Sequence, residues 1–134
     1  MNNGYYCHKI SGGFVEGEVL ISKDDICFYL VEPETGKVIE KNHDLEGKSI
    51  VDKILIFPSG KGSSVVQGEG LYMLTRNNTG PKAMIIQHPD TVLVTGAIIM
   101  NVPLVDRVEE GFYQKVKNGD RVKVDADKGL ISFI

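Results

Sequence analysis

The stretch that decides the fold of this chain is Ile54-Leu55-Ile56-Phe57-Pro58-Ser59-Gly60-Lys61-Gly62-Ser63-Ser64. Its first four residues are all apolar, with a charged residue before them and a proline after them, which predicts a strand buried on both faces. The seven residues that follow contain two glycines, one cation and three hydroxyls. The sequence therefore predicts a buried strand that opens into a polar loop.

A helix is expected directly after this loop. Ser63 or Ser64 should be its N-cap, because a serine hydroxyl can accept a hydrogen bond from a backbone N–H of the first helical turn. The loop then joins the carboxyl end of a strand to the amino end of a helix, where α/β folds usually bind ligands. Apolar or small residues recur after Ser64 at spacings that suit a helix packed on the strand: Val66, Gly70, Leu71, Met73 and Leu74.

The composition is typical of one globular domain spanning residues 1–134, with 42% hydrophobic and 25% charged residues. A formal net charge of −3 argues against nucleic acid and anionic membranes as partners, because both require clustered Lys and Arg. No apolar stretch approaches the roughly 20 residues of a membrane-spanning helix, and the polar start Met1-Asn2-Asn3-Gly4 does not resemble a signal peptide. We therefore expect a cytoplasmic protein.

The cysteines and histidines suggest no metal site in this chain. Cys7 and Cys27 are far apart and lack a CxxC spacing, so buried free thiols are expected. His43 lies in a polar segment and is expected to be a solvated loop residue without a functional role.

The amino-terminal third is predicted to be rich in β-structure with short connections. Its apolar and alternating segments are bounded by residues that favour turns, glycine and proline among them. Four strands are expected, at residues 5–10, 14–21, 28–31 and 37–39, with turns at 11–13 and 32–36.

The second half alternates between strands and helices, which predicts an α/β fold. A mixed sheet with helices on one side and additional strands on the other would form a three-layer β/β/α domain with a β-rich amino-terminal part. Residues 91–100 are either a buried helix or a strand, because their β-branched content permits both. The other expected elements are a helix stop at 77–81, strands at 83–86 and 103–106, a surface helix at 109–116, and a closing pair of strands at 121–125 and 130–134.

Two familiar loop motifs do not fit the sequence. A phosphate-binding P-loop would place its first glycine at Leu55, inside the strand, and would require a hydroxyl where Gly62 follows Lys61. A hydrolase G-x-S-x-G motif lacks its second glycine. Two alternatives remain: a serine pair that binds an anion or forms an alkoxide beside a cation, or serines that only cap a helix.

Residues 53–74 resemble the small, or swivel, subunit of the aconitase X family, together with Glu32-Pro33-Glu34-Thr35-Gly36 and Gly119-Asp120-Arg121-Val122-Lys123-Val124-Asp125. The resemblance extends over nearly the whole chain from about Ile10. It implies a swivelling β/β/α fold and a hydro-lyase that is active only with a large subunit. Characterised members dehydrate small hydroxy acids such as 5-phosphomevalonate or cis-3-hydroxy-L-proline.

The resemblance also implies roles for the loop residues. Ser63 matches the serine that acts as the base, and the residues expected to contact the anionic substrate are Ser59, Gly60, Lys61, Gly62 and Ser64. Aconitases have arginine where this chain has Val65, which leaves the contacts to the substrate anion to Lys61 or to the partner. Many relatives also carry Gly-Gly before an Asp-Pro turn, where this chain has Leu30-Val31-Glu32-Pro33.

The resemblance places the cofactor in the partner. An aconitase-type cluster takes three cysteine ligands and this chain has two cysteines, so an iron–sulfur cluster or iron is expected in the large subunit and no cofactor in this chain.

Two other functions are considered. The segments 96–99, 102–105 and 119–125 also resemble the phosphohistidine swivel domain of phosphotransferases. That domain carries its histidine where this chain has Thr95 and Gly96, so a phosphocarrier role is not expected. In a non-catalytic binding or assembly module, Ser63 would only cap the helix.

Overall fold

The computed structural model describes residues 4–134, and the polar start considered above lies mostly outside this range. Its elements alternate between strands and helices after a β-rich start, as expected. In chain order they are β1 (Gly4–Tyr6), β2 (His8–Ser11), β3 (Phe14–Ile21), the 3₁₀ helix η1 (Phe28–Leu30), β4 (Lys53–Phe57), α1 (Ser64–Arg76), β5 (Ala83–Ile86), α2 (Thr91–Ile99), β6 (Leu104–Asp106), α3 (Glu110–Lys115), β7 (Arg121–Asp125) and β8 (Leu130–Phe133).

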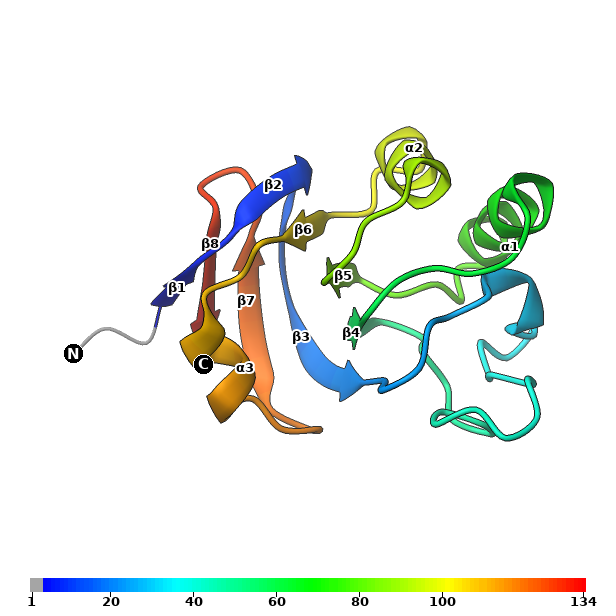
Figure 1. The fold of residues 1–134 in the computed structure, drawn as a ribbon, viewed down its shortest axis with the longest axis horizontal. Coiled ribbons are helices and arrows are strands. Elements are labelled where there is room, and N and C mark those ends of the chain that lie inside the picture. The colour runs from blue at the N-terminus through cyan, green and yellow to red at the C-terminus, as the bar shows by residue number, and fades with distance from the viewer. Residues whose placement is uncertain (1–3) are drawn as a thin grey trace.

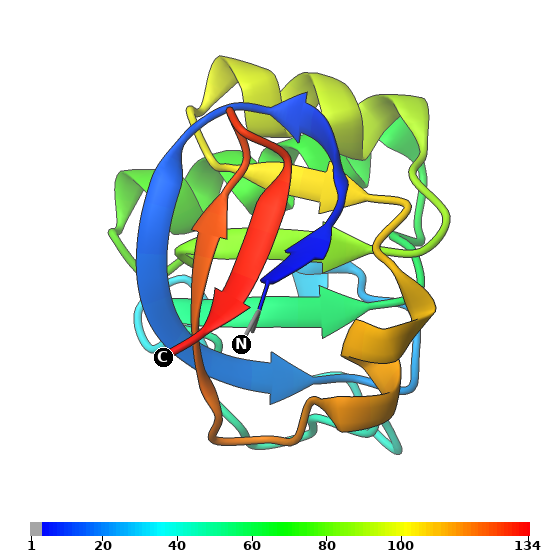
Figure 2. The ribbon, with the colours of Figure 1, turned by 90° about the vertical axis from the view of Figure 1, so that its left-hand side faces the viewer.

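The strands form one mixed sheet in the order β1-β8-β7-β3-β4-β5-β6-β2. Strands β3 to β6 are parallel, whereas β7 pairs antiparallel with both β3 and β8. The sheet bends so that β1, β7 and β8 lie on one side of the parallel strands and α1 and α2 lie on the other (Figure 1). Figure 2 shows β7 and β8 running across the parallel strands. The predicted three layers are therefore confirmed.

Strand β4 is buried on both faces because it contributes to two hydrophobic cores. Its alternate residues Leu55 and Phe57 pack with α1 and α2 in one core. Ile54 and Ile56 point to the opposite face, as the period-2 geometry of a strand requires, and pack with β7 and β8 in the second core. The four-residue apolar run thus links all three layers.

Several predictions for the amino-terminal third are wrong. The single strand expected at residues 5–10 is divided at Cys7 into β1, which pairs with β8, and β2, which pairs with β6. Of the expected strand at residues 28–31, residues 28–30 form the 3₁₀ helix η1, and Val31, like residues 37–39, makes only isolated bridges. The backbone at Phe28 lies so close to Gly70 of α1 that a Cβ on Gly70 would collide with it. Packing against this helix therefore replaces strand pairing.

The turn at residues 11–13 does not close a hairpin. Strand β2 pairs with β6, whereas β3 pairs with β4 and β7. Gly13, at φ +139°, provides a backbone conformation that an L-residue rarely adopts. The turn thus directs two consecutive strands to different parts of the sheet.

His43 is buried, contrary to the expectation of a solvated loop residue. Its side chain bonds two backbone groups: Leu45 N donates to Nδ1 at 2.9 Å, and Nε2 lies 2.9 Å from the carbonyl oxygen of Asp25. Because Nδ1 accepts, Nε2 must be the donor to Asp25, so the ring holds two loops together.

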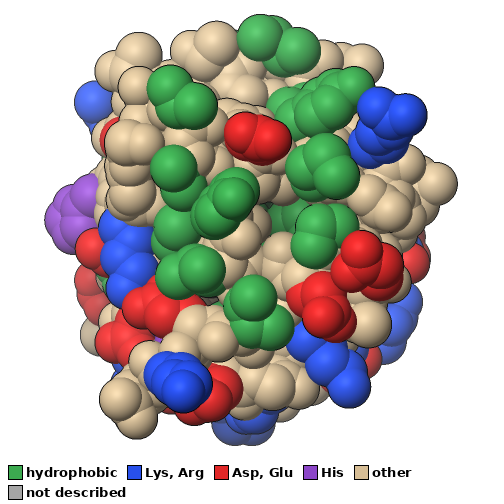
Figure 3. Space-filling view, turned by 90° about the vertical axis from the view of Figure 1, so that its right-hand side faces the viewer, with side chains coloured by type: hydrophobic (Ala, Val, Ile, Leu, Met, Phe, Trp, Pro, Cys, Tyr) green, Lys and Arg blue, Asp and Glu red, His purple; other side chains and the backbone are tan. Residues whose placement is uncertain are grey.

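The outer side of the helical layer keeps exposed apolar surface. Figure 3, which faces this layer, shows apolar side chains gathered on it. The exposed large apolar residues of α1 and α2 are Val65, Tyr72, Ile98 and Ile99. Within residues 4–134, none of the helices is both long enough and apolar enough to cross a membrane.

Candidate active-site loop at the carboxyl edge of the sheet

Three loops meet where the parallel strands β3, β4 and β5 end. The central loop, residues 58–63, is held on one side by Ile26, whose N–H donates to Ser59 O at 2.9 Å and whose carbonyl accepts from Lys61 N at 3.0 Å. On the other side, Ser59 Oγ donates to His88 O at 2.7 Å. The chain topology thus brings the predicted loop to the edge where α/β folds bind ligands.

Ser63 is the N-cap of α1, so the capping prediction is confirmed for Ser63 rather than Ser64. Its hydroxyl accepts a hydrogen bond from Val66 N at 3.3 Å, and its carbonyl accepts from Gln67 N at 3.0 Å. Ser63 and Ser64 are both exposed. The hydroxyl of the exposed Ser63 therefore lies at the positive end of a 13-residue helix.

Gly60 and Gly62 are required in the loop for different structural reasons. Gly62 adopts φ +107°, which other residues rarely tolerate. A Cβ on Gly60 would collide with the Gln67 amide and would lie 2.9 Å from Asp90 Oδ2. Gly60 therefore permits side chains from two other segments to approach the loop backbone.

Lys61 is paired with a carboxylate. Its ammonium lies 2.5 Å from Glu40 Oε2, and this hydrogen bond is the main cause that raises the pKa of Lys61 above its usual value. The negative charges of Asp24 and Asp25 add to this effect. Lys61 is thus charged at neutral pH, but a bound anion would compete with Glu40 for it.

Two polar residues beside the loop were missed by the sequence analysis. Gln67 is 5% exposed, and its Nε2 donates to Gly62 O at 3.2 Å. Asp90 is the N-cap of α2, with Oδ1 accepting from Leu93 N at 2.9 Å, so residues 91–99 form a helix rather than a strand. Gln67 could have been found from the sequence, because it is a polar residue on the same helix face as the buried Leu71 and Leu74.

The donor set of this chain does not fit an iron–sulfur cluster. Such clusters usually take three or four cysteine ligands, and the sequence has only Cys7 and Cys27. Burial, with added repulsion from Asp106 and Asp125, raises the pKa of the Cys7 thiol to about 11, which disfavours the thiolate that binds metals. Among residues 4–134, no three His, Cys, Asp or Glu side chains cluster as a metal site.

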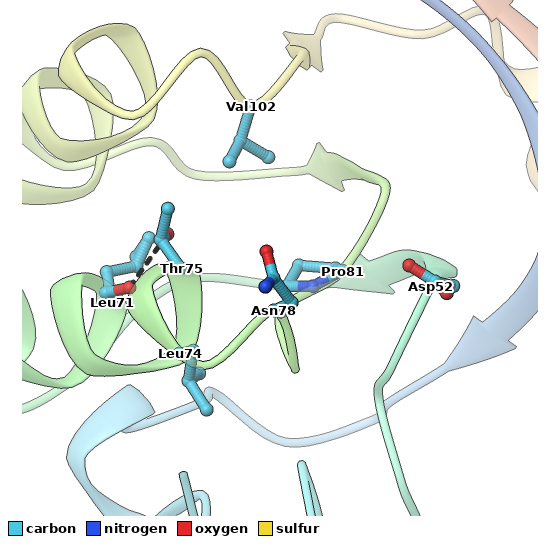
Figure 4. A pocket seen from close by; sticks show the side chains of 8 residues that line it. Asp52, Leu71, Leu74, Thr75, Asn78, Pro81 and Val102 are labelled. Atoms are coloured by element: carbon cyan, nitrogen blue, oxygen red, sulfur yellow. Dashed lines mark hydrogen bonds between the residues drawn. The ribbon is translucent and has the colours of Figure 1, made fainter. Parts of the chain in front are cut away.

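A separate cavity of about 190 Å³ lies by the last turns of α1, away from the Ser63 end (Figure 4). Thr75 Oγ1 there donates to Leu71 O at 3.0 Å within the helix. The cavity contains one carboxylate and no cation, so it lacks the groups that would bind an anion, and we place the candidate site at the loop. The lining residues are Asp52, Leu71, Leu74, Thr75, Asn78, Gly80, Pro81 and Val102.

Comparisons with known proteins agree with this fold. Residues 4–133 match the family model described as the aconitase X swivel domain. The chain is 44% identical to the phosphomevalonate dehydratase small subunit of Methanococcoides burtonii over 129 residues, which cover 96% of this chain and 93% of that protein. It is 45% identical to the protein of the same name from Thermococcus kodakarensis, over 94% of this chain and 92% of that one.

Two solved structures have the same fold over nearly their full length. The crystal structure of Thermococcus kodakaraensis aconitase X in its holo-form superposes with a TM-score of 0.88 at 43% identity, covering 98% of both chains. The solution NMR structure of a UPF0107 protein superposes with a TM-score of 0.86 at 39% identity, also over 98% of both chains.

Proposed function

Because the chain belongs to the aconitase X swivel-domain family, we propose that it is the small subunit of a dehydratase and that the substrate is 5-phosphomevalonate. The observation that carries this proposal is the identity of about 45% to phosphomevalonate dehydratase small subunits over more than nine-tenths of this chain. A small subunit of this kind works with a large subunit, which is the partner we assign to this chain.

Ser63 is the proposed base in this reaction. Dehydration breaks a C–H bond, whose electron pair forms the new C=C bond, while the C–O bond breaks and the departing hydroxide takes up a proton from solvent to become water. The proton from the C–H bond goes to Oγ of Ser63, an exposed residue whose hydroxyl accepts a hydrogen bond from Val66 N. A backbone donor and the positive helix end both favour the alkoxide over the neutral hydroxyl, so this position makes the serine a stronger base.

The remaining loop residues differ in how readily they can reach a substrate. Gly62 and Ser64 are exposed on either side of Ser63, so we assign them direct contacts with the substrate. Ser59, Gly60 and Lys61 are partly buried. The Ser59 hydroxyl is engaged with His88 and the Lys61 ammonium with Glu40, so these two shape the loop and become substrate ligands only by exchanging partners.

The activation of the leaving hydroxyl is assigned to the partner. This chain lacks the ligands of an iron–sulfur cluster, and we propose that a cluster or iron is held by the large subunit. Such a group would supply Lewis-acid chemistry to the departing oxygen.

Reconstitution tests the proposed function. The purified chain should show no dehydratase activity alone, and adding the large subunit should produce turnover of 5-phosphomevalonate, followed as formation of the unsaturated acid. The matched assay uses cis-3-hydroxy-L-proline, which we expect to be a poor substrate. Turnover by this chain alone, or preference for the hydroxyproline, would overturn the assignment of partner or substrate respectively.

A further inference from the structure

Two buried oxygen atoms beside the loop have no hydrogen-bond donor among residues 4–134. They are Oε1 of Gln67, in α1, and Oδ2 of Asp90, just before α2. A buried acceptor left without a donor is unfavourable, because it has lost its water and gained nothing in exchange. Most buried polar atoms in proteins are paired, so two such atoms at one place require an explanation.

The two atoms converge on the same point of the loop. The position that a Cβ of Gly60 would occupy has Gln67 Oε1 and Asp90 Oδ2 as near neighbours, the latter at 2.9 Å. An amide oxygen and a carboxylate oxygen are both acceptors, so neither can satisfy the other. The arrangement thus sets two partial negative charges against each other in a buried position.

Gln67 could relieve this opposition only by giving up its hold on the loop. Its Nε2 donates to Gly62 O at 3.2 Å. Turning the amide over would present the NH₂ group to Asp90 and leave the Gly62 carbonyl without its donor. Since Gly62 directly precedes Ser63, the amide of Gln67 fixes the orientation of the peptide between them.

We propose that Gln67 and Asp90 are positioning residues for Ser63: Gln67 holds the Gly62–Ser63 peptide, and Asp90 weakens that hold so that the peptide can turn when substrate or the large subunit reaches the loop. This inference rests on the proposed role of Ser63 as the base. Gly60 and Gly62 supply the conformational freedom that such a turn requires.

Asp90→Asn is the most informative variant. Asparagine is as good an N-cap as aspartate, so its Oδ1 keeps the bond to Leu93 N, while its amide nitrogen takes the place of Oδ2 and donates to Gln67 Oε1. We expect the melting temperature of the full chain to rise by about 3 °C or more. In the complex with the large subunit, kcat should fall about 5-fold or more, because a fixed peptide positions Ser63 less well at the transition state.

Gly68→Ala is the matched control. Gly68 lies in α1 with open space around the position of a Cβ, so alanine should raise the melting temperature through helix propensity alone. Its kcat should stay at the wild-type value in a complex whose formation is verified by size-exclusion chromatography. A general stabilisation would affect both variants alike, whereas a positioning role lowers kcat only in Asp90→Asn.

NMR provides a readout that does not depend on activity. Relaxation dispersion of the Ser63 amide in the isolated full chain should show millisecond exchange in the wild type, loss of that exchange in Asp90→Asn, and no change in Gly68→Ala. If Asp90→Asn had the same melting temperature and the same Ser63 exchange as the wild type, the proposal would be overturned. If Asp90→Asn alters both but the wild-type complex does not turn over 5-phosphomevalonate, the proposed function fails while the coupling of Asp90 to the loop stands.

A charge-changing variant tests whether residues 67 and 90 interact. Gln67→Glu replaces the donor to Gly62 with an acceptor and adds a charge near Asp90, so melting temperature and kcat should both fall. Adding Asp90→Asn should restore most of the melting temperature, because the asparagine amide can donate to Glu. Strictly additive effects of the two changes would show that residues 67 and 90 do not interact, which would refute the proposal.

Discussion

At the scale of single residues, Ser63 and Lys61 are accessible in the loop but are held by hydrogen bonds. Ser63 is exposed, yet its hydroxyl and carbonyl both take part in the first turn of α1. Lys61 carries a positive charge that is largely offset by Glu40. An anionic substrate would therefore meet mainly backbone N–H groups and the amino end of α1. Lys61 could bind it only after releasing Glu40.

Replacing Ser63 separates its two roles. Ser63→Ala removes the hydroxyl that caps α1, which should cost about 0.5 to 2 kcal/mol of stability, because the helix keeps its packing on the sheet. Loss of a positioned base should lower kcat of the reconstituted complex by roughly 10² to 10⁴. Thermal unfolding and steady-state kinetics measure the two effects. Near-normal kcat in a fully formed complex would show that Ser63 is only a cap, as in a non-catalytic assembly module.

Lys61 and Glu40 should act as a pair in substrate binding. Lys61→Ala removes the cation and leaves a carboxylate that repels the substrate, so KM should rise about 10-fold, equivalent to about 1.4 kcal/mol. Lys61→Arg keeps the charge and should be milder, although the geometry changes. Adding Glu40→Gln to Lys61→Ala should recover part of the affinity. If the double variant had a KM as high as that of Lys61→Ala alone, Glu40 would not affect substrate binding.

At the scale of elements, α1 connects the candidate site to the core. Its first residues lie beside the candidate loop, and its buried residues Gln67, Gly70, Leu71 and Leu74 face the sheet and η1. Gly70 brings α1 directly against the backbone of Phe28, and this close contact sets the position of the whole helix. The close spacing of α1 and η1 therefore depends on the absence of a side chain at Gly70.

Two glycines of α1 should respond oppositely to alanine. At Gly70 a Cβ would collide with backbone atoms of Phe28 and Tyr29, so Gly70→Ala should destabilise the chain by about 1 to 3 kcal/mol despite its better helix propensity. At Gly68 the space is open, and alanine should stabilise by up to about 1 kcal/mol. Urea unfolding measures both. Equal effects would mean that the helix does not depend on close approach to η1.

At the scale of the whole molecule, the three layers present the loop at an open edge of the sheet. The cores lie on both faces of the parallel strands, so the three loops at the carboxyl edge lie outside both cores. Under the proposed function, residues of this chain supply a base and backbone donors, and the large subunit supplies the ligands of the cluster. The complete active site would then lie between the two subunits.

Purification of the chain alone tests the cofactor assignment. Because two cysteines cannot supply the usual ligand set, the isolated chain prepared anaerobically should show no absorption of an iron–sulfur cluster and less than one iron per ten chains by metal analysis. The large subunit prepared in the same way is the control. A stoichiometric cluster retained by this chain alone would contradict the assignment.

The sequence by itself determined the central strand, the loop and the helix that Ser63 caps. These follow from interactions between residues close in the chain: a continuous apolar run, a proline, and a hydroxyl three residues before the N–H that it accepts from. The same local signals predicted the helix stop after α1 and the antiparallel pair β7 and β8. The loop residues brought together by the fold are contiguous, so their proximity also followed from the sequence.

Only the tertiary structure decided what surrounds the loop. Glu40 meets Lys61 across 21 positions of the chain, and Asp90 meets Gly60 because two parallel strands end at one edge. Strand β2 pairs with β6 rather than with β3, which follows it in the chain, and residues 28–30 form a 3₁₀ helix, because segments far along the chain provide strand pairing and close packing there. Such contacts leave no periodic pattern in the sequence, since they depend on which distant segments the folded sheet places side by side.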